Sequence, residues 1–159
     1  MTPPGPLTTR AATPVDDRFL RDLYASVRDP ELAAVPWSDA EKRTFCDMQF
    51  TLQDRHYREY FPHAHRHVVL EAASAVGQIY VDHASDEIRI LDIALVPAAR
   101  GRGIGTRLLR NILEEADRTR RRVSLVTEPG NPARRLYARL GFIDRDAGPL
   151  HVEMVRSPS

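Results

Sequence analysis

A strand, a glycine-rich turn, a helix and a second strand follow one another between residues 87 and 127, and this order constrains the fold more than any other feature. The segment 87–96 first alternates in polarity and then ends in the apolar run IALV, which is typical of a strand half-exposed at its start and buried at its end. The turn contains RGRGIG at 100–105, and VSLVT at 123–127 is the second strand. Between them, one helical face carries Ile104, Leu108, Leu109, Ile112, Leu113 and Ala116. Because a helix connects the two strands, we expect them to lie parallel in one sheet.

The first sixty residues predict two helices after a short strand at 7–10. Thr13–Pro14 can begin the first helix, since proline fits the first helical position, and Asp29–Pro30 ends its apolar pattern. The second helix begins at the capping-box sequence Ser38–Glu41 and ends before Pro62. One stripe along it consists of Phe45, Met48, Leu52, His56 and Tyr60.

The remaining segments predict short strands and one short helix. Strands are expected at 68–72, 75–81, 142–146 and 150–156. The first two surround a turn at Ala73–Ser74, and a connection this short makes them antiparallel. Asn131 can cap a helix with Pro132 at its first position, and Gly141 stands where a helix-terminating glycine belongs. The fold class is therefore α/β, with a mixed sheet of about seven strands and helices on both faces.

Composition indicates an ordinary globular protein. The 159 residues suit one domain, which we place at 7–156 between flexible tails at 1–6 and 157–159. Hydrophobic residues make up 42% and charged residues 28%, and the net charge is +1, so no strong field attracts nucleic acid or membranes. Only Lys42 among the 23 basic residues is a lysine, which suggests a GC-rich bacterial genome.

We expect neither a signal peptide nor a membrane span. The N-terminus lacks the charged and apolar regions of a signal peptide, and no apolar run approaches the roughly 20 residues of a membrane span. Cys46 is the only cysteine, so no intrachain disulfide can form. We therefore expect a cytoplasmic protein, as a monomer or a homodimer.

The RGRGIG turn predicts an anion site at the start of a helix. Gly101 and Gly103 begin a G-x-G-x-x-G pattern that fails at Thr106, and the lysine of a P-loop is missing, so neither nucleotide-binding motif fits. Successive backbone N–H groups can still cradle phosphate oxygens there, and the helix dipole favours negative charge. The alternative is a glycine-rich turn with solvated arginines.

Two segments resemble the signatures of the GNAT superfamily of N-acetyltransferases. Arg100-x-x-Gly103-x-Gly105 after IALVP resembles its acetyl-CoA loop, and NPARRLYARLGF at 131–142 resembles its second signature. The resemblance covers about a third of the chain, 88–142. It implies a centrally splayed sheet, with acetyl-CoA as co-substrate and no metal.

The resemblance implies how the cofactor is held. Its pantetheine arm would lie in the splay against the backbone of Ile93, Ala94 and Leu95, with the Ile93 amide directed at the acetyl oxygen. The backbone amides of Gly101, Arg102, Gly103, Ile104, Gly105 and Thr106 would take the pyrophosphate, and Arg100 is a further expected cofactor contact. Asn131 is a further candidate contact, although it lies six residues before Tyr137 where seven are common.

Three residues are candidate catalytic groups. Tyr137 matches the tyrosine that protonates the departing CoA thiolate in many members, and the Ile93 amide would stabilise the negative charge that develops on the acetyl oxygen. In some members a glutamate acts as the general base at the position where this chain has Arg89, and an arginine cannot act as a base. We favour Asp92 as the base, with the strand-end carboxylates Glu71 and Glu128 as alternatives.

The resulting expectation is transfer of acetyl from acetyl-CoA to a primary amine, by direct attack within a ternary complex. Cys46 lies in the helical N-terminal region, far in sequence from the cofactor strand, which argues against an acyl-cysteine. The alternative is a GNAT-like module that binds acyl-CoA without turnover. The acceptor can be a small molecule or a protein amine.

Two further groups of residues have open roles. Trp37, Tyr57, Tyr60 and Phe61 either line the acceptor pocket or only pack. His63, His65 and His67 alternate and would face one way if extended, as metal ligands do, but no carboxylate or cysteine completes a metal site at a known spacing.

Overall fold

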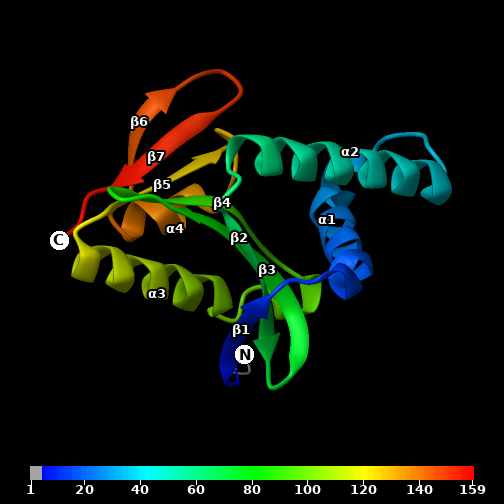
Figure 1. Ribbon diagram of the computed structural model, residues 1–159. Helices are drawn as coiled ribbons and strands as arrows, with labels where there is room; N and C mark the ends of the chain where they lie inside the picture. Colours follow the sequence, from blue (N-terminus) through cyan, green and yellow to red (C-terminus); the bar gives the residue numbers. More distant parts are fainter. Residues whose placement is uncertain (1–4) are drawn as a thin grey trace.

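The computed structural model describes residues 5–159, and within that range it contains one mixed sheet (Figure 1). The strand order is β1-β2-β3-β4-β5-β7-β6, and every neighbouring pair is antiparallel except the parallel pair β4–β5. The strands are β1 (Leu7–Ala11), β2 (His65–Glu71), β3 (Ser74–His83), β4 (Glu87–Leu95), β5 (Arg122–Thr127), β6 (Ile143–Ala147) and β7 (Val152–Arg156). The predicted tail at 1–6 falls largely outside the described residues.

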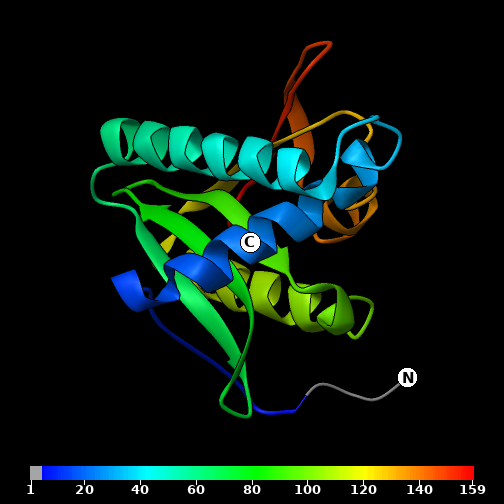
Figure 2. The same ribbon diagram turned by 90° about the vertical axis from the view of Figure 1, so that its right-hand side faces the viewer.

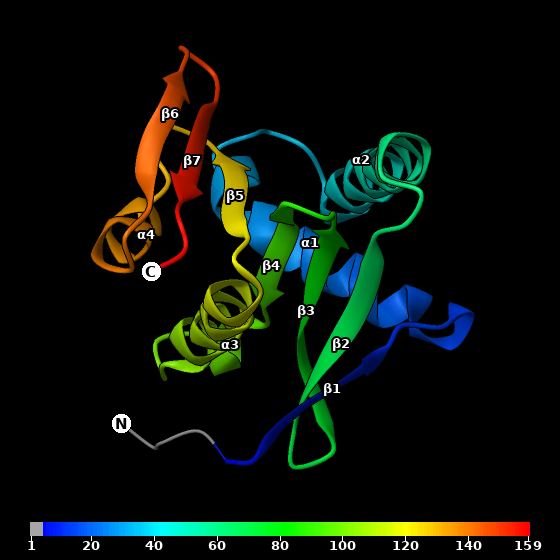
Figure 3. The same cartoon turned by 60° about the vertical axis from the view of Figure 1, so that its left-hand side comes forward.

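Helices cover both faces of the sheet, as predicted. They are α1 (Asp17–Leu32), α2 (Asp39–Tyr60), α3 (Ile104–Thr119) and α4 (Arg134–Arg139). Figure 2 shows α1 and α2 in front of the sheet, and Figure 3 shows α3 and α4 in front of the opposite face. None of the helices in the described part of the chain is long and apolar enough to cross a membrane.

The main core lies between the sheet and α3. All six apolar residues of the predicted α3 face are buried, from Ile104 to Ala116. They pack with Ile88 and Ile90 of β4 and with Val123 and Leu125 of β5. The predicted parallel crossover is confirmed, because β4 and β5 pair in parallel and α3 connects them.

The N-terminal helices differ from the prediction in two ways. Pro30 does not end α1, which continues to Leu32. The proline removes the helical hydrogen bond to the carbonyl of Ser26, and the helix ends two residues after it. In α2 the Ser38 capping box is confirmed, but the predicted stripe is not the buried face. Cys46 and Phe50 are buried, whereas the stripe residues Met48, Leu52 and Tyr60 are 53%, 48% and 64% exposed.

Two details of the strands also correct the prediction. The β2–β3 turn lies at Ala72–Ala73, one residue earlier than expected, and both alanines have positive φ, +46° and +75°. In β4 the burial is reversed: Ile88 and Ile90 in the first half are buried, and every residue from Leu91 to Leu95 is partly exposed. The second half of β4 is exposed because its neighbour β5 has departed from it.

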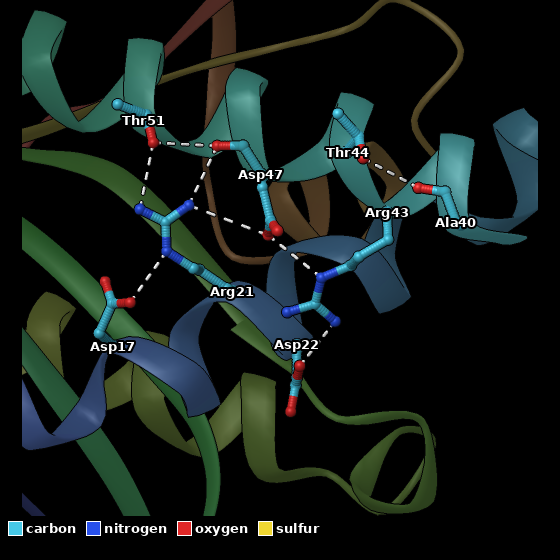
Figure 4. A network of polar contacts seen from close by, with 8 residues as sticks. All are labelled: Asp17, Arg21, Asp22, Ala40, Arg43, Thr44, Asp47 and Thr51. Carbon is cyan, nitrogen blue, oxygen red and sulfur yellow. Dashed lines mark hydrogen bonds and ion pairs between the residues drawn. The ribbon is translucent and has the colours of Figure 1, made fainter.

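Ion pairs hold α1 against α2 (Figure 4). Arg21 of α1 donates to the carbonyl oxygen of Asp47 at 3.1 Å and to Thr51 Oγ1 at 3.1 Å. Arg43 of α2 pairs with Asp22 of α1 at 2.7 Å, and within α2 it also pairs with Asp47 at 3.1 Å. These contacts fix the two helices as one wall over the sheet.

Candidate functional site

The sheet opens at its centre. β4 and β5 pair only from Glu87–Arg122 to Ile90–Leu125, and β4 then continues to Leu95 without a partner on that side. Backbone N–H and C=O groups that a strand leaves unpaired can bind an extended ligand as an added strand would. The splay that the resemblance implied is therefore present at the expected strand.

A β-bulge lies where the splay begins. Tyr80 of β3 faces Asp92, but the next residue of β3, Val81, faces Ile90, so Leu91 is an extra residue in β4. The hydroxyl of Tyr57 donates to the carbonyl oxygen of Leu91 at 3.0 Å. Burial, together with the nearby Asp92, raises the pKa of Tyr57 to about 12, so this donor keeps its proton at neutral pH. A bulge re-aims the side chains that follow it.

A cavity of about 1270 Å³ passes through this opening. Residues of α1 and α2 line one side, residues of α3 and α4 line the other, and β4 and β5 lie between them. Of the residues predicted for the site, the cavity wall includes Asp92, Ile93, Ala94, Leu95, Arg100, Gly105, Asn131 and Tyr137. Gly101, Arg102, Gly103, Ile104 and Thr106 are not part of this wall.

The RGRGIG turn leads from β4 into the N-terminus of α3. Gly101 and Gly103 have φ of +72° and +81°, and the space where a Cβ would stand is empty within 4 Å at both. Glycine is therefore favoured at both positions because the backbone is left-handed there, and not because a side chain would collide with neighbouring atoms. The first amides of α3 have no carbonyl four residues earlier in the helix to bond, which makes this terminus suited to an anion.

The arginine side chains of this turn contact the protein itself. Arg100 donates through Nε to the carbonyl oxygen of Leu95 at 3.0 Å, which fixes the end of β4. Arg102 forms two hydrogen bonds to the carboxylate of Glu71 on β2, at 2.9 and 2.7 Å. Glu71, one of the alternative bases, is thus held by Arg102 and does not line the cavity.

Asp92 follows the bulge and is one of the carboxylates that line the cavity. It is half-buried and accepts a hydrogen bond from the Nε2 of Gln78, a β3 side chain that is only 4% exposed. Burial raises the pKa of Asp92, whereas the Gln78 donor, Arg66, Arg28 and the Ile93 amide lower it, and the net direction is upward. A raised pKa improves a carboxylate as a proton acceptor near neutral pH.

Tyr137 lies on α4 across the opening from Asp92. It is 7% exposed, and its ring packs against Phe142 at a centroid distance of 5.8 Å. Burial and the nearby Asp92 raise its pKa, so its hydroxyl stays protonated at neutral pH. Gly141 has φ of +98°, and the amide of Phe142 bonds the carbonyl of Tyr137 at 3.0 Å, so the predicted helix end is confirmed.

Asn131 precedes α4 in a turn, and the prediction that it caps the helix is wrong, because the N-cap of α4 is Ala133. The Oδ1 of Asn131 accepts a hydrogen bond from the amide of Ala133 at 2.9 Å, and its Nδ2 donates to Thr127 Oγ1 at 2.7 Å. The α-helix itself begins at Arg134, three residues after Asn131. The side chain thus joins the end of β5 to the start of α4 at the edge of the cavity.

The residues with open roles now have positions. Tyr57 and Phe61 line the cavity, whereas Trp37 and Tyr60 do not. Glu128 also lines it, at the end of β5. Within residues 5–159, no group of three or more His, Cys, Asp or Glu side chains could hold a metal ion.

The cavity residues that do not figure in the site predicted from the sequence include Gln78, His56 and His151. A polar residue inside the apolar strand AVGQIYV is a signal for Gln78, because an amide at a buried strand position needs a polar partner. The sequence places His56 only in a helical stripe. His151 has no signal, since its place depends on how β7 returns beside β5.

A comparison with models of protein families shows which family this chain belongs to. The model of the acetyltransferase (GNAT) family matches residues 20–142, which is more than half of the chain. The protein belongs to this family. It is a GNAT N-acetyltransferase, and the resemblance seen in its two motifs is confirmed. No curated protein sequence is similar enough to count as a match.

Solved structures share the fold at low sequence identity. The PaiA N-acetyltransferase of Thermoplasma acidophilum, in complex with coenzyme A, has a TM-score of 0.72 and 14% identity over 96% of this chain and 99% of its own. An acetyltransferase of Thermus thermophilus has a TM-score of 0.68 and 21% identity over 95% and 96%. A GNAT acetyltransferase of Elizabethkingia anophelis with acetyl-CoA bound has a TM-score of 0.60 and 15% identity over 95% and 97%.

Proposed function

We propose that this acetyltransferase moves the acetyl group of acetyl-CoA to a primary amine by direct attack within a ternary complex. The observation that carries the proposal is the convergence of three features on one cavity. They are the unpaired second half of β4, the carboxylate of Asp92 and the hydroxyl of Tyr137.

The chain's own residues fit acetyl-CoA. The backbone of Ile93, Ala94 and Leu95 lies in the cavity wall on a strand segment without a neighbour on the β5 side, which suits an extended pantetheine arm. The positive-φ glycines place the free amides of the α3 N-terminus next to that segment, which suits the pyrophosphate. Acetyl-CoA supplies the thioester that the amine attacks.

Proton movements follow from the two titratable groups. An amine with a pKa near 10 is almost fully protonated at pH 7, so it must lose a proton before it attacks. Asp92 accepts that proton, and its raised pKa brings it closer to the working pH. The Ile93 amide stabilises the charge on the acetyl oxygen, and Tyr137 donates a proton to the sulfur that leaves.

Direct attack is supported by the place of the lone cysteine. Cys46 is buried on α2, is 3% exposed and is not part of the cavity wall. Burial also raises the pKa of its thiol, which lowers the fraction present as the nucleophilic thiolate. The acetyl group therefore passes to the amine without an acyl-cysteine.

Thiol release from acetyl-CoA tests the proposal against the alternative of a binding module. The protein is incubated with acetyl-CoA and a panel of amines, and free CoA is measured alongside binding of acetyl-CoA by calorimetry. We expect amine-dependent release of CoA. Binding without release for every amine would favour the acyl-CoA-binding module, and absence of binding would refute the cofactor assignment.

A further inference from the structure

Large apolar side chains are exposed around the mouth of the cavity. Val27 of α1, Leu52 of α2 and Val126 of β5 are 39%, 48% and 45% exposed, and all three line the cavity. Leu150, 72% exposed, lines an adjacent hollow of about 360 Å³ that shares Val126 and His151 with the main cavity. Exposed apolar residues that gather from separate elements mark a binding surface.

Aromatic side chains also line this cavity. Tyr24, Tyr57 and Phe61 line it, and the rings of Tyr57 and Phe61 meet edge to face at 6.4 Å. Arg89 lies over Phe61, with its guanidinium carbon 5.9 Å from the ring centroid, and pairs with Glu153 at 3.3 Å. An apolar ligand could therefore contact ring faces along its length.

The charges of the cavity wall balance. The wall contains three arginines and three carboxylates: Arg28, Arg89, Arg100, Glu31, Asp92 and Glu128. Arg28 and Glu31 form a pair at 3.3 Å. Arg89 is likewise paired, with Glu153, so Asp92 and Glu128 are the carboxylates of this wall without an ion pair to a described residue. One carboxylate, Asp92, lies deep in the wall beside the opening of the sheet.

We propose that the acceptor is a monoamine, with its one amino group at Asp92 and an apolar body against Val27, Leu52 and Val126. This inference rests on the proposed acetyl transfer and names its substrate class. Such an amine can be a free arylalkylamine or the N-terminal residue of a peptide with an apolar side chain. Polyamines and aminoglycosides do not fit, because their further charges would lie against the apolar mouth.

Thiol release with three probes tests the substrate class. The probes are 2-phenylethylamine, a tripeptide that begins with phenylalanine, and spermidine. We expect kcat/KM for at least one of the first two to exceed that for spermidine by about tenfold or more, since one methylene alone can be worth about 10–200-fold in an apolar pocket. Whichever of the two is faster identifies a free or a peptide-borne amine. Preference for spermidine would overturn the inference and leave the acetyltransferase proposal intact.

Two matched variants on α2 test where the apolar body lies. Leu52→Glu places a charge in the cavity wall, whereas Met48→Glu changes a residue one helical turn away that is similarly exposed, at 53%, and does not line the cavity. We expect Leu52→Glu to raise KM for the preferred monoamine by about tenfold or more. Met48→Glu should leave KM unchanged, and both variants should bind acetyl-CoA as the unmodified protein does. Equal KM values in all three proteins would contradict the assignment.

Discussion

The hydroxyl of Tyr57 donates a 3.0 Å hydrogen bond to the carbonyl oxygen of Leu91, the residue that bulges out of β4. This bond links α2 to the strand position directly before Asp92. Tyr57→Phe leaves the Leu91 carbonyl without that partner. A hydrogen bond typically contributes about 0.5–1.5 kcal/mol, and we expect the free energy of unfolding in urea to fall by that amount. We also expect kcat to fall, because the hydrogen bond that fixes the strand directly before Asp92 is lost.

Tyr60→Phe provides the control on the same helix. Tyr60 is 64% exposed and is not part of the cavity wall, so removal of its hydroxyl should change neither stability nor rate. Equal behaviour of the two variants would show that the Tyr57–Leu91 bond contributes nothing to the site.

Gln78→Leu should move the pH profile of the enzyme. The Gln78 donor stabilises the ionised form of Asp92, so its removal raises the pKa of Asp92 further. Asp92 must be ionised to accept a proton, so the acid limb of kcat/KM should move to higher pH. The groups that also act on this pKa are Arg66 of β2, Arg28 of α1 and the Ile93 amide of β4. The measurement is kcat/KM from pH 5 to 9.

Two controls separate this effect from a loss of packing. Gln49→Leu changes another amide of the cavity wall and should leave the acid limb in place. Asp92→Asn should remove the limb and lower kcat/KM at pH 7 by at least about tenfold, with recovery toward pH 9 as more amine is neutral. A pH-independent loss in Asp92→Asn would return Asp92 to a structural role and leave water, His56 or His151 as the proton acceptor.

Tyr137→Phe should slow the chemical step and leave the fold unchanged. The ring would still pack against Phe142, and only the proton donor would be lost. General-acid assistance is typically worth about 10²–10⁴-fold, and we expect kcat to fall by that factor in single-turnover measurements. Acetyl-CoA affinity should be nearly unchanged. A rate equal to that of the unmodified enzyme would leave Tyr137 with its packing role alone.

Gly103→Ala should weaken acetyl-CoA binding through the backbone. Gly103 has φ of +81°, and an alanine in the left-handed region costs about 1–2 kcal/mol, which the turn can relieve by moving its amides. Acetyl-CoA at about 100 times its Kd should stabilise the unmodified protein by about 2.7 kcal/mol, and the variant by less at the same concentration. Gly148→Ala, where a Cβ would stand 3.6 Å from the carbonyl of His151, should keep the full shift.

Asp117 and Arg156 should contribute to stability in a pH-dependent way. Arg156 of β7 donates to Asp117 of α3 at 2.6 Å and holds the pKa of that carboxyl at about 2, below its ordinary value of 3.8. Because the folded pKa is the lower one, the contribution is present above about pH 4 and is lost as the pH falls toward 2. Asp117→Asn should therefore lower Tm at pH 6, and the difference should vanish near pH 2.

Local patterns predict the parts of the fold that depend on neighbours in sequence. The α3 face, the glycine turn before it and the Ser38 cap all follow from spacing within a few residues, and each is confirmed. Asp92 is a candidate from its place one residue before Ile93, and the structure adds its burial and its raised pKa.

Features that depend on the register between strands could not be predicted from the sequence. The contact between Gln78 and Asp92 joins strands whose alignment includes a one-residue shift, so counting along either strand does not find it. The prediction that the apolar stripe of α2 is its buried face was wrong for a related reason. Apolar spacing identifies a face but not what covers it, and here Leu52 faces the cavity while Phe50 faces the core.

The splay between β4 and β5 divides the site into parts with different freedom to change over evolutionary time. On the side proposed for the cofactor, the site consists of the unpaired backbone of β4 and a turn with two positive-φ glycines, which most side-chain substitutions leave in place. On the other side the wall consists of side chains such as Val27 and Leu52, on two helices that polar contacts join (Figure 4). Descendants of this chain could therefore acquire new acceptors by exchanging a few helix residues while they inherit the same donor unchanged.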